Sequence, residues 1–176
     1  MADTIKIKDS TVNIMKGDLT LLETEAIVYY AKQDLSLGSG YGNAISTRGG
    51  PAIKEELSKV GNVNICDVVI TGAGSLNAKH IVHAVGPAFM EESTAAKLRN
   101  TIVNTLKTAE SKGITQLAFP VMGSGFYGVP YDVSIGIMFE CFKEHLSNNS
   151  KIKEIIVCAN DNRELRMLTS KASNLN

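Results

Sequence analysis

The chain has 176 residues, and its 18 lysine and arginine residues balance its 18 aspartate and glutamate residues. This length is typical of one domain, so we expect a single domain over residues 1–176, large enough to bury roughly two-thirds of the surface that the unfolded chain exposes. Because the formal charge is zero and no run of like charge occurs, the sequence argues against a protein that binds nucleic acid through electrostatic attraction.

The sequence contains no apolar stretch typical of a membrane span or a secretion signal. The first residues, Met1 to Lys6, have no apolar core of signal-peptide length, and nowhere do about 18 apolar residues follow one another. The three cysteines, Cys66, Cys141 and Cys158, lie in apolar segments without Cys-x-x-Cys spacing. This pattern favours buried thiols in a reducing compartment over redox or metal roles. We therefore expect a cytoplasmic protein that does not contact membranes.

Short apolar runs, either continuous or alternating with polar residues, predict seven strands. They fall at residues 5–7, 12–15, 26–30, 68–71, 80–85, 116–121 and 154–159.

Helical spacing of apolar residues predicts helices at about residues 43–60, 96–106 and 133–146. A last short helix begins near Arg163, with fraying expected from Lys171 onward. Strands and helices alternate after residue 25, which indicates an α/β protein with a largely parallel sheet between helices and an antiparallel edge formed by the first two strands.

Two glycine-rich segments stand between a predicted strand and a predicted helix. One runs from Ala118 to Pro130 and contains Gly123, Gly125 and Gly128; the other runs from Leu35 to Ile45 and contains Gly38, Gly40 and Gly42. Glycines leave backbone N–H groups unshielded, and the positive end of a following helix dipole favours anions. The segment from Ala118 to Pro130 does not have the spacing of a Rossmann or Walker loop, so the pair predicts two phosphate-binding loops of another kind.

With these two loops in place, the sequence resembles the macro domain family, the ADP-ribose-binding module. The resemblance covers nearly the whole chain and rests on five elements in the family's order. They are residues 16–20 (KGDLT), residues 25–28 (EAIV) with the first glycine loop, residues 69–71 (VIT), residues 80–87 (HIVHAVGP) and the second glycine loop. The resemblance implies a three-layer α/β/α sandwich with a mixed, largely parallel central sheet.

The resemblance also implies a set of ligand-binding residues. Asp18 takes the place of the family's aspartate that accepts a hydrogen bond from the adenine amino group, although Gly-Asp-x-Thr is also an ordinary turn or helix cap. The expected ligand-binding residues are Asp18, Leu19, Ser39, Gly40, Tyr41, Gly42, Gly123, Ser124, Gly125, Phe126 and Tyr127. Phe126 or Tyr127 suits the apolar face of a ribose, with plain core packing as the alternative.

The sequence departs from the family's hydrolases at the positions that serve catalysis. Where those enzymes carry Asn-Ala-Ala-Asn, this chain has Tyr29 to Lys32, so a cation stands in the place of the asparagine that orients the distal ribose. The acidic residue expected before the first-loop helix corresponds to Gly42 or Asn43, and the phosphatase-type histidine is missing as well.

The adenine end departs too, since the last strand is followed by Asn160 where binders often have an aromatic side chain that stacks on the purine. Which aromatic replaces it stays open. His80 and His83 lie three apart on one strand and point to opposite faces, so they do not form a zinc site together. We expect His83 to be a satisfied core histidine, and we expect no metal and no cofactor.

The first functional hypothesis is a module that binds ADP-ribose, a related nucleotide or an ADP-ribosylated protein. The alternative is a hydrolase that releases ADP-ribose from protein or deacetylates O-acetyl-ADP-ribose, with Lys32 or Asp34 as the candidate catalytic residues. A third hypothesis, a nucleic-acid binder, is disfavoured by the zero net charge.

Overall fold

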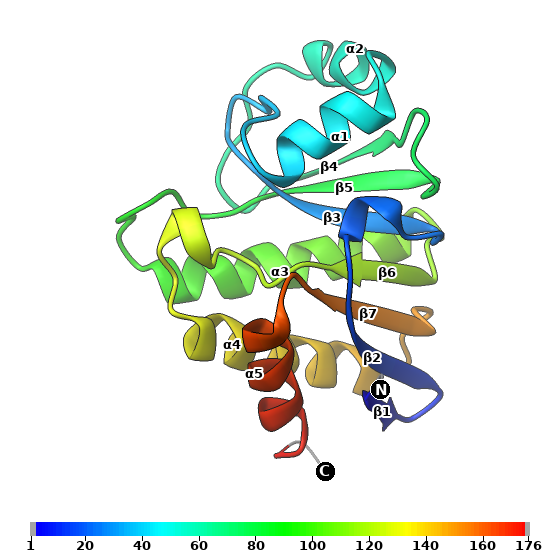
Figure 1. Cartoon of the computed structure of the whole chain (residues 1–176), viewed down its shortest axis with the longest axis vertical. Coiled ribbons are helices and arrows are strands. Elements are labelled where there is room, and N and C mark those ends of the chain that lie inside the picture. Colours follow the sequence, from blue (N-terminus) through cyan, green and yellow to red (C-terminus); the bar gives the residue numbers. More distant parts are fainter. Residues whose placement is uncertain (1–2, 175–176) are drawn as a thin grey trace.

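A computed structural model describes residues 3–174, and in it seven strands form one sheet in the order β1-β2-β7-β6-β3-β5-β4. Figure 1 shows them in this succession from β4 at the top to β1 at the bottom. The strands are β1 Asp3–Ile7, β2 Ser10–Lys16, β3 Ala26–Ala31, β4 Val68–Gly72, β5 His80–Val85, β6 Gln116–Phe119 and β7 Glu154–Ala159. All seven predicted strands are therefore confirmed.

The sheet is parallel in its centre and antiparallel at both edges. Strands β2, β7, β6, β3 and β5 pair in parallel, while β1 pairs antiparallel with β2 and β4 antiparallel with β5. The antiparallel edge formed by the first two strands was expected, whereas the second such edge at β4 was not. A buried parallel centre explains why β3 is apolar on both faces, with all six residues buried.

Helices cover both faces of the sheet. They are α1 Tyr41–Gly49, α2 Ala52–Ser58, α3 Thr94–Ser111, α4 Tyr131–Ser147 and α5 Asn162–Ala172, with short 3₁₀ turns η1 Leu19–Leu21 and η2 Gly125–Tyr127. One core cluster joins α3, α4 and α5 to the sheet, and a second joins α1, α2 and η1 to its other face. Val28 and Tyr30 of β3 belong to the first cluster, and Ile27 and Tyr29 to the second. The predicted α/β/α sandwich is confirmed.

The helix expected over residues 43–60 is wrong as a single element. The chain forms α1 and α2 instead, because Gly50 adopts a positive φ of 78° and is followed by Pro51, which cannot continue a helix. The strand expected to reach Val121 ends at Phe119, where the chain turns into the second glycine loop.

Two smaller expectations also change. Cys141 and Cys158 are buried as expected, but Cys66 is only half-buried, because it lies in a turn before β4 where its Sγ donates to the Lys97 carbonyl at 3.4 Å. Helix α5 continues to Ala172, and the expected fraying at residues 175–176 lies outside the described residues. None of the helices in residues 3–174 is both long and apolar enough to cross a membrane.

Candidate functional site

Both glycine loops lie at the edge of the sheet where the central parallel strands end. The first loop follows β3 and the second follows β6, and β3 and β6 are hydrogen-bonded neighbours. Ligands of α/β proteins bind at this kind of edge. A pocket of about 300 Å³, here called the central pocket, has lining residues from both loops. Its lining is Tyr29, Tyr30, Lys32, Gly38, Ser39, Gly40, Tyr41, Pro120, Val121, Gly123, Ser124, Gly125, Phe126, Tyr127, Tyr131, Asn160 and Glu164.

Two further pockets adjoin the central pocket and extend it into a cleft. The Asp18 pocket, of about 410 Å³, is lined by Asp18 and shares Gly40, Tyr41 and Asn160 with the central pocket. The Phe89 pocket, of about 640 Å³, shares Lys32, Phe126 and Tyr127 with it. Eight of the eleven expected ligand-binding residues line the central pocket, and Asp18 lines its neighbour.

The other two expected residues, Leu19 and Gly42, line neither pocket. The Leu19 side chain is buried in the core cluster under α1. Gly42 is buried in the first turn of α1, where a Cβ would come within 2.5 Å of the Tyr29 hydroxyl oxygen. Gly42 therefore allows α1 to approach β3 closely.

The first loop leads directly into α1. Gly40 has a positive φ of 63° and is the N-cap of α1. Among the described residues, no side chain caps this end by a hydrogen bond and no acidic residue lies in the first turn. The N–H groups at this helix start therefore lack a side-chain cap and lie beside the central pocket, an arrangement that favours anions in general.

The second loop bends at three glycines. Gly123, Gly125 and Gly128 have φ values of 73°, 73° and 75°, which only glycine adopts without strain. The Tyr127 ring packs on Tyr30 of β3 with ring centroids 4.2 Å apart, while the Phe126 side chain is exposed. Of these two aromatic side chains, Phe126 is therefore not packed in the core, whereas Tyr127 both packs on the core and lines the cleft.

Asp18 is held in place by Thr20 and by Arg48, which lies 30 residues further along the chain. Its Oδ1 accepts from the backbone N–H and hydroxyl of Thr20, at 2.9 and 2.7 Å, and its Oδ2 lies 2.6 Å from Nη1 of Arg48 on α1. Partial burial raises the pKa of Asp18, but these hydrogen bonds outweigh that effect and hold it below its usual value. Asp18 is thus an ionised, positioned acceptor at one end of the cleft.

Lys32 and Asp34 lie toward the other end. The Nζ of Lys32 is 3.3 Å from the position that a Cβ on Gly38 would take, so the ammonium group lies against the first glycine loop. Lys32 is the only cationic side chain among the described residues that line the central pocket. Asp34 lines the Phe89 pocket, and hydrogen bonds from the Ser36 N–H and hydroxyl hold its pKa below its usual value.

At the junction of the central and Asp18 pockets, the Tyr41 hydroxyl donates to Oδ1 of Asn160. Tyr41 comes from the start of α1 and Asn160 follows β7, so this contact joins two sides of the cleft. Burial raises the pKa of Tyr41, which stays protonated. The Tyr41 ring is therefore the aromatic side chain next to Asp18, at the end where Asn160 replaces the expected aromatic residue.

Glu164 was not among the expected site residues. It is 4% exposed and is the only carboxylate among the described residues lining the central pocket. Its Oε2 accepts from the Asn160 N–H at 2.8 Å, while Asp161 caps α5 by accepting from the Glu164 N–H at 2.8 Å. The signal was present as the capping pattern Asp-x-x-Glu at residues 161–164. This pattern gives Glu164 a structural role at the start of α5.

His83 is fully buried, as expected, but only one of its ring nitrogens is satisfied. Its Nε2 lies 2.9 Å from Oγ1 of Thr71, which donates to the Gly72 carbonyl and so accepts from His83. The Nδ1 atom has no partner among the described residues, and burial lowers the pKa of His83 to about 4. Within residues 3–174, no group of three or more histidine, cysteine, aspartate or glutamate side chains is arranged to hold a metal ion.

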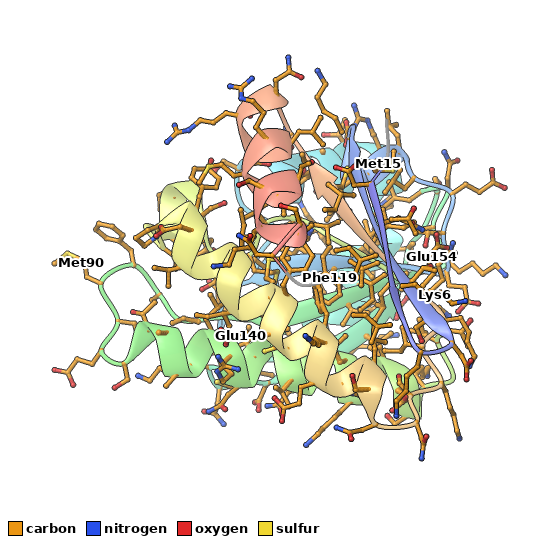
Figure 2. All side chains as sticks on the ribbon, turned by 90° about the horizontal axis from the view of Figure 1, so that it is seen from below. Lys6, Met15, Met90, Phe119, Glu140 and Glu154 are labelled. Carbon is orange, nitrogen blue, oxygen red and sulfur yellow. The ribbon has the colours of Figure 1, made fainter. Side chains whose placement is uncertain are left out.

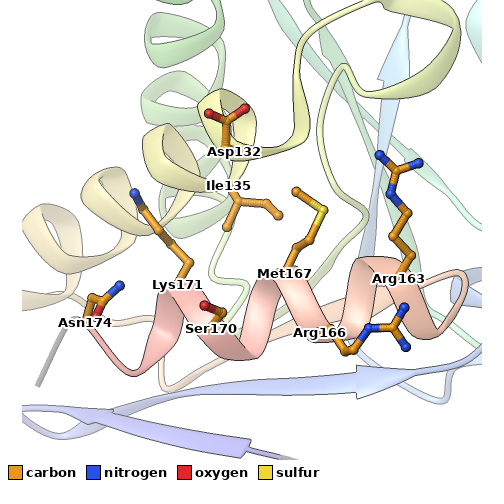
Figure 3. Close-up of a pocket in the computed structure, with 8 residues that line it drawn as sticks. All are labelled: Asp132, Ile135, Arg163, Arg166, Met167, Ser170, Lys171 and Asn174. Carbon is orange, nitrogen blue, oxygen red and sulfur yellow. The ribbon is translucent and has the colours of Figure 1, made fainter.

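A separate pocket of about 380 Å³ lies between α4 and α5 (Figure 3). Ile135 and Met167 give it an apolar wall, and Arg163, Arg166 and Lys171 of α5 stand around it with Asp132 of α4. Neither glycine loop contributes to it. The candidate site is therefore the cleft and not this pocket.

Comparisons with known proteins agree with this geometry. The family model described as Macro domain matches residues 28–138. An uncharacterized protein of Sulfurisphaera tokodaii is 39% identical over 150 residues, which cover 83% of this chain and 82% of the relative. A macro domain-containing protein of Caldanaerobacter subterraneus subsp. tengcongensis is 35% identical, with 82% of this chain and 85% of the relative covered.

A protein named O-acetyl-ADP-ribose deacetylase 2, from Pantoea vagans, is 30% identical over 84% of this chain and 90% of its own length. The fold matches the Oceanobacillus iheyensis macrodomain with ADP at a TM-score of 0.93 and 24% identity, with 99% of this chain and 96% of that chain covered. The matched motifs, the fold and these relatives agree, and the chain belongs to the macro domain family.

Proposed function

We propose that this protein binds ADP-ribose, free or attached to a protein, along the cleft. In the proposed complex, the adenine of ADP-ribose lies in the Asp18 pocket, the diphosphate in the central pocket and the distal ribose toward the Phe89 pocket. The observation that carries the proposal is the central pocket itself, which two glycine loops and an uncapped helix start surround. Lys32 is the one cation among the described residues that line it. Backbone N–H groups and a lysine are what a diphosphate requires.

At the adenine end, Asp18 accepts from the amino group and the Tyr41 ring contacts the base. Asp18 retains accepting capacity, because each carboxylate oxygen has two lone pairs and Oδ2 has one partner, Arg48. Tyr41 replaces the stacking aromatic that the last strand lacks.

We assign Lys32 to phosphate binding and not to catalysis. Its ammonium group lies against Gly38 and faces the pocket that would hold the diphosphate. Asp34 is a poor general base, since hydrogen bonds to Ser36 lower its pKa. Glu164 already accepts from a backbone N–H. These contacts favour a binding module with weak turnover.

Hydrolysis is the second candidate function, and the 30% identical O-acetyl-ADP-ribose deacetylase 2 of Pantoea vagans favours it. The two functions are separated by measuring ADP-ribose binding calorimetrically and then following the release of acetate from O-acetyl-ADP-ribose and of ADP-ribose from a mono-ADP-ribosylated protein. We expect binding with turnover about 10² to 10⁴ slower than that of a dedicated hydrolase, because water-orienting groups are lost at Lys32 and Gly42.

Lys32→Met tests the role of the lysine. An ammonium group near an exposed diphosphate contributes about 1 kcal/mol, so the variant should bind ADP-ribose about fivefold more weakly, with a smaller dependence on salt. Lys6→Met, an exposed lysine on the edge strand β1, is the matched control (Figure 2). Lys32→Asn should orient the distal ribose better and raise the rate of hydrolysis slightly at most. If the wild type hydrolyses its substrate fast and Lys32→Asn abolishes that activity, Lys32 is catalytic.

A further inference from the structure

The side chains that stand out on the surface are three large apolar residues at one end of the cleft. Phe89, Met90 and Phe126, here called the apolar rim, are 60%, 84% and 77% exposed. They have the highest exposures of any large hydrophobic side chains in residues 3–174. Exposed apolar side chains that gather in one place mark an interaction site, whereas single ones scattered over the surface do not.

The rim residues come from two segments that are far apart in the sequence and meet in the fold. The Phe89 ring lies against the second glycine loop, since a Cβ on Gly128 would be 2.8 Å from it. Phe89 and Phe126 both line the Phe89 pocket. Figure 1 shows the loop before α3, in green, beside the η2 turn, in yellow, and Figure 2 shows Met90 at the outer end of the molecule.

The Phe89 pocket is larger than a sugar requires. Its volume of about 640 Å³ is more than twice that of the central pocket, about 300 Å³. Besides the aromatic residues, its lining includes Gln33, Asn62 and Asn64, whose side chains end in amide groups. Amide groups both donate and accept, as a peptide backbone does.

We infer that the apolar rim and the Phe89 pocket bind the polypeptide that carries the ADP-ribose, with an apolar side chain of that polypeptide against Phe89 and Met90. The inference rests on the proposed function, in which the distal ribose, and so the bond to the protein, lies at this end of the cleft. Lys32 and Asp34 are the only charged side chains among the described residues lining this pocket, and their charges cancel. Glu91, next to Met90, is neutralised by Lys97 at 2.6 Å. Glu92 adds an exposed carboxylate, so this largely apolar surface has no excess of positive charge. It suits a polypeptide segment and offers nothing to a polyanion.

The test uses two ADP-ribosylated peptides of equal length and charge, one with leucines and one with serines beside the modified residue, and free ADP-ribose as the reference. The full chain should bind the leucine peptide about tenfold more tightly than the serine peptide or ADP-ribose. Phe89→Ser and Met90→Ser, made separately, should each remove most of that preference. Met90→Ser should leave the Kd for free ADP-ribose unchanged, because Met90 does not line the Phe89 pocket. Leu21→Ser is the control, because Leu21 is 53% exposed but lies on η1.

Equal affinity for both peptides overturns the inference while the proposed function stands. So does a Met90→Ser variant that weakens free ADP-ribose as much as it weakens the leucine peptide. Self-association of the chain that both rim variants abolish, with no peptide preference, assigns the rim to a second copy instead and also overturns it. Failure of the wild type to bind free ADP-ribose overturns the proposed function and the inference together.

Discussion

Replacement of Gly125 by valine tests why the second loop has a glycine at this position. The glycine is needed either for its backbone conformation or for close approach of the ligand. Gly125 has a φ of 73°, and no atom lies within 4 Å of the position that its Cβ would take. The Cβ of a valine there meets no steric clash, but the left-handed backbone costs about 1 to 2 kcal/mol of folding free energy. That cost corresponds to a fall in Tm of about 2 to 8 °C for a chain of this size.

The chain contains a matched control. Gly113 has a φ of 82°, also with no atom within 4 Å of a Cβ, but it lies between α3 and β6 at the opposite end of β6 from the cleft. Gly113→Val should therefore lower Tm by a similar amount and leave ADP-ribose binding unchanged. Gly125 lines the central pocket, so its valine variant should in addition lose one or two charge-assisted hydrogen bonds to the diphosphate. At about 1.5 to 3 kcal/mol each, the loss of one alone weakens binding at least about tenfold.

The assay is calorimetric titration with ADP-ribose, together with a thermal melt of each variant. The reasoning is refuted if Gly125→Val binds ADP-ribose as the wild type does, because the second loop then does not contact the phosphates. It is also refuted if both valine variants lose binding equally, since the effect would then come from backbone strain alone.

Three further predictions concern single side chains. Asp18→Ala should weaken the binding of ADP-ribose about tenfold and that of ribose 5-phosphate hardly at all, because only ADP-ribose carries the adenine amino group. Equal losses of affinity in parallel titrations would show that Asp18 does not bind the adenine. Tyr41→Leu should weaken ADP-ribose binding by about 1 to 3 kcal/mol. Tyr41→Phe keeps the ring but loses the hydrogen bond to Asn160, and it should bind nearly as the wild type does. Two equally weak variants would mean that the hydrogen bond and not the ring matters. The pKa of His83 is about 4 in the folded chain and 6.5 in the unfolded chain, so the unfolded chain binds one more proton between these pH values. The free energy of unfolding should therefore fall by about 1.4 kcal/mol per pH unit as the pH decreases through this window. Urea unfolding of His83→Gln should lack this contribution, and identical pH profiles for variant and wild type would contradict it.

Local sequence patterns determined most of the fold. Every strand was visible as an apolar run, because a buried strand must be apolar on one or both faces, and the alternation with helical spacing indicated a parallel centre. The positions of the two glycine loops followed as well, since both come directly after strands that turned out to be neighbours. The break between α1 and α2 is also determined by the local sequence, at Gly50 and Pro51. The helical spacing of the apolar residues on either side nevertheless predicted one continuous helix.

Contacts between distant segments were decided by the tertiary structure alone. Arg48 reaches Asp18 because α1 packs on η1, and Tyr41 reaches Asn160 because the start of α1 lies near the end of β7. The lack of a partner for Nδ1 of His83 within residues 3–174 likewise depends on which atoms the neighbouring strand and the core bring to the ring. Periodicity tells which face of an element is buried, but the partner of a polar side chain depends on the register and packing of elements that the local pattern does not relate to one another.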